Sequence, residues 1–279
     1  MKKIRNISII GAGAMGAAYA AMLSDAGDFS VSFVARGERY KRLREGSLTV
    51  NGKQYAVPVI HPDEVTEPAH LVLVALKHHH LRGALQDIKA LVGDDTIILS
   101  VMNGLESEEI IGSVCGMEKI VYATAVGIDA IREGNSFNYT SPGKIIFGDG
   151  PRSLGGDRLE CLKEALNRAS IPNEVPTDIM RMMWWKFMIN VGINQASAVL
   201  RAPYGIFQTS PDAKALMRSL MQEVIAVAQK IDIDLTTKDL DAWDKVLSTL
   251  SPMGKTSMLQ DIEAGRKTEV EIFGVKVVA

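Results

Sequence analysis

A glycine-rich turn between a predicted strand and a predicted helix constrains the fold of this chain more than any other feature. Residues 4–10 are rich in isoleucine, and an alanine-rich stretch that favours a helix runs to about Ala26. Between them stand Gly11, Ala12, Gly13, Ala14, Met15 and Gly16. Strand, G-x-G-x-x-G and helix in this order indicate a unit that holds the pyrophosphate of a dinucleotide at the helix N-terminus. The alternative is a glycine-rich turn with a purely structural role.

The end of the next predicted strand, residues 29–34, bears on which dinucleotide is bound. Enzymes that use NAD commonly place an acidic residue there to bind the ribose hydroxyls. This chain instead has Ala35 followed by Arg36, with Arg39 close behind. The guanidinium of Arg36 suits a 2′-phosphate through charge-assisted, bidentate hydrogen bonds, which predicts NADP(H) as the cofactor. Arg39 either assists Arg36 or belongs to a solvated helix face.

Two further apolar runs predict strands that are buried on both faces, as in a parallel sheet. Residues 71–76 form the first run, which ends at Lys77, and residues 96–102 form the second, which ends at Asn103. Both polar residues follow the carboxyl end of a strand, where such sheets bind ligands. Three histidines follow Lys77, but neighbouring side chains point in different directions, so we expect no metal site.

Other local patterns set the domain organisation. Asn51-Gly52 between alternating apolar residues predicts a hairpin. Later β segments, including residues 144–148, have a more antiparallel character, and a helix is expected over 159–169. Two prolines within residues 171–176 predict a domain boundary. We therefore expect an α/β fold with a dinucleotide-binding domain over residues 1–176 and an all-α domain over 177–279.

The second domain is predicted to begin with a helix over residues 178–200 that carries Lys186, Asn190 and Asn194. Positions i, i+4 and i+8 form one polar stripe on a helix of about 3.6 residues per turn. The rest of the helix is almost uniformly apolar, which indicates that it is buried. A buried ammonium needs partners or an anionic ligand. Alternatively, Lys186 extends to water and the two asparagines cap neighbouring loops.

Start signals and apolar spacing predict the later helices. Ser210 and Pro211 suit the N-cap and first position of a helix that ends near Lys230. The residues expected to line its buried face are Leu216, Leu220, Val224 and Val227. A further helix begins at Thr237, and its expected buried stripe is Leu240, Trp243, Leu247 and Leu250.

Composition excludes several classes of function. The net charge of −2 argues against a nucleic-acid partner, which would favour a basic face. No apolar run is long enough to cross a bilayer, and Ser8 with the early glycines would make a poor signal sequence. Cys115 and Cys161 form no framework, which suits a reducing compartment. We therefore expect a cytoplasmic protein with no membrane partner.

Taken together, these residues resemble the ketopantoate reductase (2-dehydropantoate 2-reductase) family over essentially the whole chain. The matching positions are the glycine motif, Lys77, Asn103-Gly104, the Lys186, Asn190 and Asn194 stripe, and the sequence Ser257-Met258-Leu259-Gln260-Asp261 followed by Glu269. The resemblance implies an N-terminal Rossmann domain, a helical second domain, and reduction of 2-dehydropantoate to pantoate by NADPH.

The resemblance also implies a role for each matched residue. Lys186 would give a proton to the carbonyl oxygen, and Glu269 would hold the ammonium and the substrate. The residues implied to bind substrate are Asn190, Asn194, Ser257 and Asn103. Asn103 would also meet the cofactor, as would Lys77. A fixed ammonium suits this chemistry, because hydride addition to a 2-keto acid places negative charge on the oxygen.

The chain departs from the family pattern at three places. Gly254 stands where members commonly have asparagine, which would remove one contact with the substrate. Glu106 and Ser107 replace a glycine–asparagine pair after Asn103-Gly104. Most members also continue as a helical segment beyond Gly274. The apolar residues 270–278 would then be left bare, which predicts self-association through this end or a chain cut from a longer one.

Two other functions stay open beside the reductase. One is a related reductase that acts on a different 2-keto acid, which the changes at Gly254 and Glu106 would favour. The other is a non-catalytic NADP(H)-binding sensor. The retained Lys186 and Glu269 speak against the sensor, since binding alone needs only the first domain.

Overall fold

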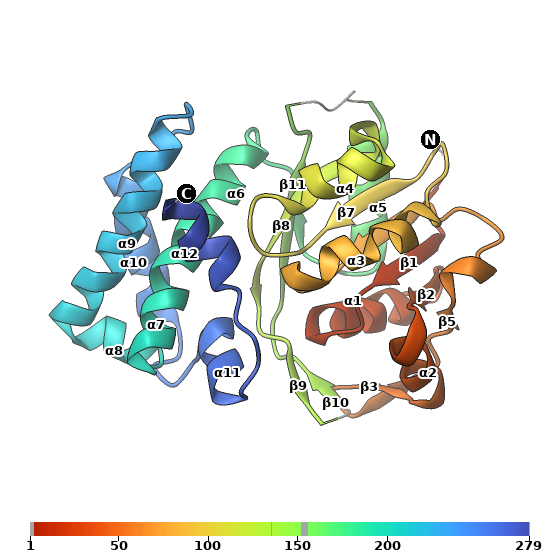
Figure 1. Cartoon of the computed structure of the whole chain (residues 1–279), viewed down its shortest axis with the longest axis horizontal. Coiled ribbons are helices and arrows are strands. Elements are labelled where there is room, and N and C mark those ends of the chain that lie inside the picture. Colours follow the sequence, from red (N-terminus) through yellow and green to blue (C-terminus); the bar gives the residue numbers. More distant parts are fainter. Residues whose placement is uncertain (1–2, 135, 152–155, 279) are drawn as a thin grey trace. The chain divides into compact units, whose positions relative to one another are not determined.

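The computed structural model describes residues 3–134, 136–151 and 156–278, and these divide into two compact units (Figure 1). The first unit comprises residues 1–102 and 106–179, and the second comprises 103–105 and 180–279. The structure therefore assigns Asn103, Gly104 and Leu105 to the helical unit, although they follow a strand of the first. The first unit ends at Ile179, three residues beyond the domain boundary predicted at 176.

The first unit is built on a mixed sheet, which contains eight strands in the described part of the chain. Its parallel strands are β1 (Asn6–Ile10), β2 (Ser30–Val34), β5 (Val59–Ile60), β6 (Leu71–Val74), β7 (Ile97–Ser100) and β8 (Ile120–Ile128). They lie side by side in the order β5-β2-β1-β6-β7-β8, which is the strand order of a Rossmann sheet. The predicted α/β fold is thus confirmed, and β1 and β6 flank the point where the strand order reverses.

Two later strands extend this sheet beyond β8. β11 (Pro142–Gly148) pairs antiparallel with β8, as the sequence indicated. β12 (Asn173–Glu174) then pairs parallel with β11. The proline-bearing segment 171–176 is therefore an edge of the first unit and not a free linker.

Helix α1 (Ala14–Asp25) lies between this sheet and a smaller one. The smaller sheet has the order β4-β3-β10-β9 and is formed by β3 (Leu48–Val50), β4 (Lys53–Tyr55), β9 (Ile131–Glu133) and β10 (Ser136–Asn138). Asn51 and Gly52 both have positive φ angles between β3 and β4, which confirms the predicted hairpin. Ala17 and Ala21 of α1 pack against Val50 and Phe137 of the small sheet. Small side chains suit α1 because the helix is covered on two sides.

The other helices of the first unit complete its layers. They are α2 (Gly37–Glu45), α3 (His78–Lys89), α4 (Ser107–Cys115) and α5 (Arg158–Arg168), with short 3-10 turns η1 (Pro62–Glu64) and η2 (Met117–Lys119). α3 and α4 pack against each other, and α4 also contacts β8 (Figure 1). Apolar side chains of α1, α5 and the sheet share one buried core.

The second unit is entirely helical among its described residues. It contains α6 (Ile179–Ile189), η3 (Asn190–Asn194), α7 (Gln195–Leu200), α8 (Tyr204–Thr209), α9 (Pro211–Gln229), α10 (Thr237–Thr249), α11 (Ser257–Glu263) and α12 (Val270–Val278). Its core gathers side chains from these helices around η3 and α9. None of the helices in the described residues combines the length and apolar character needed to cross a bilayer.

Two details of the predicted helices differ from the structure. The helix expected over 178–200 is interrupted by η3, a π-helical turn that contains Asn190 and Asn194. The buried face of α9 carries Met217 and Met221, whereas Leu216 is 40% exposed. Of the four residues predicted to line that face, Leu216 was wrong, because the neighbouring Met217 fills the core instead. Val224 is buried as predicted, and Leu220 packs against the core. The N-cap of α9 was right, since Ser210 accepts a hydrogen bond from the Ala213 amide.

Candidate functional site

The glycine turn of the first unit combines two close backbone contacts with one open position. A Cβ atom on Gly16 would lie 1.8 Å from the Gly11 carbonyl oxygen, and one on Gly11 would lie 2.4 Å from the Ala75 oxygen. Gly13, in contrast, has nothing within 4 Å of that position, and no side chain caps the first N–H groups of α1 there. Gly11 and Gly16 therefore close the strand–helix turn, while Gly13 leaves an open approach to the helix N-terminus, which attracts anions.

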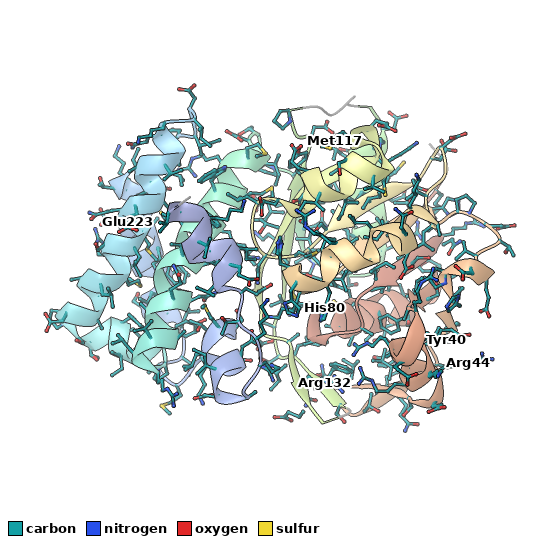
Figure 2. The ribbon with its side chains drawn as sticks, viewed as in Figure 1. Tyr40, Arg44, His80, Met117, Arg132 and Glu223 are labelled. Carbon is teal, nitrogen blue, oxygen red and sulfur yellow. The ribbon has the colours of Figure 1, made fainter. Side chains whose placement is uncertain are left out.

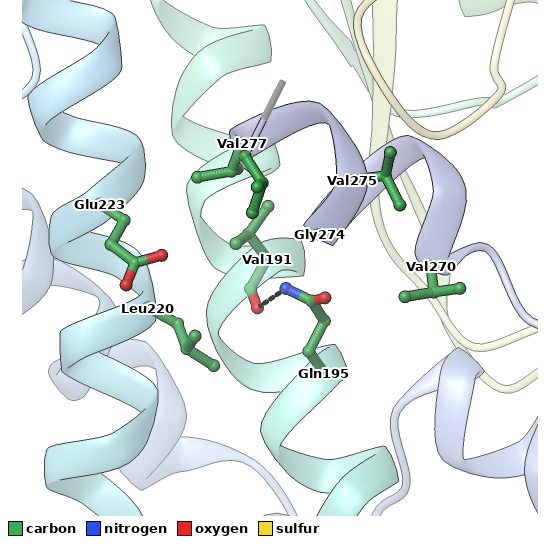
Figure 3. A pocket seen from close by; sticks show the side chains of 9 residues that line it. Val191, Gln195, Leu220, Glu223, Val270, Gly274, Val275 and Val277 are labelled. Atoms are coloured by element: carbon green, nitrogen blue, oxygen red, sulfur yellow. Dashed lines mark hydrogen bonds between the residues drawn. The ribbon is translucent and has the colours of Figure 1, made fainter.

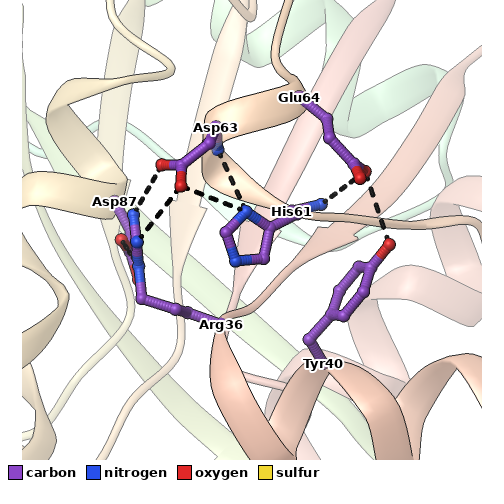
Figure 4. A network of polar contacts seen from close by, with 6 residues as sticks. All are labelled: Arg36, Tyr40, His61, Asp63, Glu64 and Asp87. Atoms are coloured by element: carbon purple, nitrogen blue, oxygen red, sulfur yellow. Dashed lines mark hydrogen bonds and ion pairs between the residues drawn. The ribbon is translucent and has the colours of Figure 1, made fainter.

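Arg36 follows β2 and is held by two carboxylates (Figure 4). Its Nε donates to Asp87 Oδ1 of α3 at 2.9 Å, and its NH2 atom donates to Asp63 Oδ1 of η1 at 2.9 Å. These hydrogen bonds, with Asp87 as the largest cause, raise the pKa of the Arg36 guanidinium. Arg36 thus stands where the sequence placed it, but it already has two anionic partners in the protein.

A wider polar cluster surrounds this pair. Glu64 accepts hydrogen bonds from the backbone N–H of His61 and from the Tyr40 hydroxyl, both at 3.4 Å. Arg44 of α2 donates to the same hydroxyl, and Figure 2 shows the two side chains together. The rings of Tyr40 and His61 meet edge to face at 5.3 Å. The cluster thereby connects η1 to α2 beside Arg36.

Arg39 is partly buried and supports the glycine turn from α2. Its NH2 atom donates a 2.6 Å hydrogen bond to the carbonyl oxygen of Ala12. Burial, together with the charges of Arg42 and Arg132, lowers the pKa of Arg39. Of the two alternatives left open by the sequence, the solvated helix face is therefore wrong. Lys77, the other basic residue expected here, is the N-cap residue of α3 after β6.

In the second unit, the structure joins two of the predicted site residues that are far apart in sequence. Nδ2 of Asn103 donates a 2.9 Å hydrogen bond to Oε2 of Glu269, and Glu269 is only 6% exposed. Leu105, two residues later, packs against the core of the helical unit. A buried carboxylate that accepts an amide hydrogen bond stays oriented, because few alternatives are open to it.

Lys186 and the two asparagines lie along one continuous helical path. Lys186 is in the last turn of α6 and is partly buried. Asn194 donates a 3.3 Å hydrogen bond to Asn190 Oδ1 within the π turn. Turns of this type are rare and frequently occur at functional sites. The two amides are thus linked to each other, and Asn194 is buried while Asn190 keeps part of its surface exposed.

Two other elements bring the remaining predicted residues to this helix. α11 and α12 both pack on the π turn and on α7. Ser257 is the first residue of α11, and the preceding Thr256 caps the helix by accepting from the Leu259 amide. The rings of Phe187 and Phe273 are 6.3 Å apart, so α12 also packs against α6. Ser257 therefore begins one of the two helices that contact the asparagine-bearing turn, and Glu269 directly precedes the other.

Gly254 has a packing reason for lacking a side chain. A Cβ atom there would lie 2.9 Å from the Tyr204 ring and 3.0 Å from the Ser251 carbonyl oxygen. The Gly254 carbonyl also accepts a hydrogen bond from the Tyr204 amide. The asparagine that the family pattern would place here does not fit without movement of this ring.

An apolar groove of about 480 Å³ lies elsewhere on the helical unit (Figure 3). It is formed by η3, α7, α9 and α12, and its lining residues are Val191, Gln195, Leu220, Glu223, Val270, Gly274, Val275, Val277 and Val278. Val275 and Val278 are well exposed, whereas Ile272 and Phe273 of the same helix are buried in the core. The predicted apolar end is therefore only partly covered by its own unit.

Sequence reasoning missed the two acidic partners of Arg36. Asp63 and Asp87 are 27 and 51 positions away from it, and no spacing rule connects them. The available signal was indirect: Asp63 follows Pro62 at the start of a short turn that comes after a strand.

Comparison with known proteins agrees with this architecture. A model of the ketopantoate reductase PanE/ApbA family matches residues 7–152, and the model of its C-terminal part matches residues 178–279. A 2-dehydropantoate 2-reductase of Aquifex aeolicus is 27% identical over 278 residues, which span 97% of this chain and 88% of that relative.

Solved structures share the fold over nearly the whole chain. The crystal structure of 2-dehydropantoate 2-reductase from Geobacter metallireducens has a TM-score of 0.86 at 26% identity, covering 98% of this chain and 92% of that one. D-mandelate dehydrogenase in a ternary structure with NADH and anilino(oxo)acetate also has a TM-score of 0.86, at 24% identity, with coverage of 98% and 90%. Because the family models match most of both halves, the chain belongs to the ketopantoate reductase family of oxidoreductases.

Proposed function

We propose that this protein uses NADPH to reduce 2-dehydropantoate to pantoate, a step towards pantothenate and coenzyme A. The observation that supports this most directly is the hydrogen bond from Asn103 to the buried carboxylate of Glu269. It orients an acid in the helical unit that also carries Lys186 and the linked pair Asn190 and Asn194.

Each of these side chains has its own role in the proposed reaction. Lys186 donates a proton to the oxygen of the keto group as negative charge develops there. Glu269 favours the charged form of an ammonium brought close to it and helps to orient the substrate. Asn190, Asn194 and Ser257 bind the polar groups of the substrate. The amide of Asn103 stands at the junction of cofactor and substrate.

The glycine turn and Arg36 are proposed to hold the cofactor. Gly13 leaves the approach to the first turn of α1 open, so the residues present fit a dinucleotide pyrophosphate. Lys77 adds positive charge beyond the carboxyl end of β6, and Arg36 binds the 2′-phosphate. When bound, the reduced nicotinamide supplies the hydride.

A second substrate class is favoured by one specific observation. The ring of Tyr204 occupies the space that a side chain at position 254 would need, so the contact expected from the family's asparagine is missing. A different 2-keto acid could use that changed surface, and D-mandelate dehydrogenase shares this fold. The alternative proposal is therefore an NADPH-dependent reductase of another 2-keto acid.

Oxidation of NADPH with a panel of substrates tests both proposals. The panel contains 2-dehydropantoate, branched-chain 2-keto acids and an aromatic 2-keto acid, each followed by the loss of NADPH absorbance. We expect the highest kcat/KM with 2-dehydropantoate. A higher kcat/KM with another member would favour the alternative. Tight NADPH binding without turnover of any member would contradict both and favour a sensor.

A further inference from the structure

Arg36 offers two hydrogen-bonding edges, and the protein occupies both. Asp87 takes the Nε atom, and its side chain is only 14% exposed. Asp63 faces the two terminal nitrogens, at 2.9 Å from NH2 and 3.4 Å from NH1, and its side chain is 66% exposed. The edge with both terminal nitrogens is one that binds phosphate in a bidentate manner, and it is occupied by the more exposed of the two acids.

Asp63 is itself held in place at the start of η1. Its backbone N–H donates to Nδ1 of His61 at 3.3 Å, and its Oδ2 lies 3.5 Å from the same nitrogen. Figure 4 shows the carboxylate turned towards the guanidinium of Arg36. The ion pair is thus a positioned feature of the turn after β5.

The charges around the terminal nitrogens of Arg36 affect the binding of NADPH and NADH differently. One guanidinium between two carboxylates leaves a local excess of negative charge, which opposes a 2′-phosphate and not a 2′-hydroxyl. A phosphate must displace Asp63 from Arg36, whereas a ribose hydroxyl can donate to a carboxylate. Exposed ion pairs of this kind are weak, so displacement is feasible but carries a measurable cost.

We propose that Asp63 is a specificity-determining residue of the dinucleotide site, whose carboxylate competes with the 2′-phosphate for the terminal nitrogens of Arg36. The preference for NADPH over NADH then depends on Asp63 as well as on Arg36. This preference is smaller than Arg36 alone would produce. This inference rests on the proposed use of NADPH, and it assigns no part of the chemical step to Asp63.

Direct binding of NADPH and NADH to the full chain tests this inference without a substrate. Asp63→Asn removes the competing charge and keeps the shape of the side chain. We expect it to tighten NADPH binding about three- to fivefold while NADH binding changes less than about twofold. Glu64→Gln is the matched control, because Glu64 is the next residue of η1 and does not bind Arg36. It should leave the ratio of the two dissociation constants unchanged.

A double-substituted chain shows whether Asp63 acts through Arg36. In an Arg36→Ala background, Asp63→Asn should no longer tighten NADPH binding, since there is no guanidinium to release. The gain in the single variant should also shrink as salt screens the exposed charges. Equal tightening of both cofactors, an unchanged ratio in Asp63→Asn, or an equal gain in Glu64→Gln would overturn the inference. If the unaltered chain binds neither cofactor, the proposed function fails instead.

Discussion

At the scale of the residue, two ionisable side chains are placed where their protonation has consequences. Lys186 is a partly buried charge in an apolar helix of the second unit. Glu108 is buried in the first turn of α4, where it accepts a 2.8 Å hydrogen bond from Ser107. Ser107 in turn is 2.8 Å from Ser100, at the end of β7. The first residue bears on the reaction, and the second bears on stability.

Replacement of Lys186 tests the proton donor. We expect Lys186→Ala to lower kcat by about 10²- to 10⁴-fold, the usual range for loss of a general acid. NADPH binding should be nearly unchanged, because the proposed dinucleotide site lies in the first unit. Steady-state kinetics and cofactor titration measure the two effects. Lys267→Ala is the control, since Lys267 is an exposed lysine that pairs with Glu271 on the surface. Nearly full turnover in Lys186→Ala would show that the polar stripe is structural.

Burial of Glu108 predicts a pH dependence of folding stability. Desolvation raises the pKa of this carboxyl from 4.5 to about 7, against the opposing hydrogen bonds from Ser107 and backbone N–H groups. Between about pH 4.5 and 7 the folded state therefore binds more protons than the unfolded state. The contribution of Glu108 to the free energy of unfolding must then fall as pH rises through this window.

The Glu108→Gln variant isolates that contribution. Between pH 5 and pH 8, the decrease in the free energy of unfolding should be smaller in Glu108→Gln than in the unaltered chain. The difference between the two chains should be about 3 kcal/mol at most. Urea unfolding at the two pH values measures it. Glu67→Gln provides the control, because Glu67 is an exposed glutamate of the first unit that lies outside α4. Parallel pH profiles for the unaltered chain and Glu108→Gln would contradict the prediction.

At the scale of the element, the first strand and helix depend on glycines that have different reasons to be there. Gly16 meets the Gly11 carbonyl, so it is needed for the turn itself. Gly13 is the N-cap residue of α1 and has open space around it. Gly16 is therefore required by the turn, whereas Gly13 leaves space that the proposed ligand would use.

A pair of alanine substitutions separates these roles. Gly16→Ala forces a methyl group into a backbone oxygen, and we expect it to lower the free energy of unfolding by about 1–3 kcal/mol or more. Gly13→Ala should cost at most about 1 kcal/mol, as for other N-cap changes. It should nevertheless weaken NADPH binding about tenfold or more, because its methyl group enters the open approach. Denaturant unfolding and cofactor titration measure both variants. Normal NADPH affinity in Gly13→Ala would mean that the pyrophosphate binds elsewhere.

At the scale of the whole molecule, the main feature is the exposed apolar groove beside α12. Val275 is 56% exposed and Val278 is 86% exposed, next to a groove whose lining is mostly apolar. Contiguous exposed apolar surface commonly marks a site of association. We expect the chain to self-associate through α12.

Light scattering over a range of concentrations tests this expectation. Val275→Glu should shift the chain towards the monomer, because burial of the new charge in an interface is unfavourable. Val246→Glu is the matched control, since Val246 is an exposed valine of α10 that does not line the groove. A monomer at every concentration would show that α12 needs no partner. Intact mass spectrometry checks whether the chain measured has a mass of 30.3 kDa.

Much of the fold follows from patterns that are local in the sequence. The glycine turn and the Asn51-Gly52 hairpin depend on backbone angles that few other residues accept, so neighbouring residues suffice to predict them. The buried strand β6 shows as an uninterrupted apolar run because both of its faces are covered. The prediction for Leu216 in α9 was wrong because Leu216 and Met217 are both apolar, and only the packing of the helix decides which one is buried.

The sequence by itself thus determined the order of the elements, the glycine turn and the positions of Arg36 and Lys186. Only the tertiary structure decided their partners. Glu269 reaches Asn103 across 166 positions of the chain, and Asp63 reaches Arg36 across 27. The π turn at Asn190 also depends on packing, because its residues have no pattern that distinguishes them from an ordinary helix. Contacts between distant segments depend on how the elements pack, which local backbone preferences do not specify.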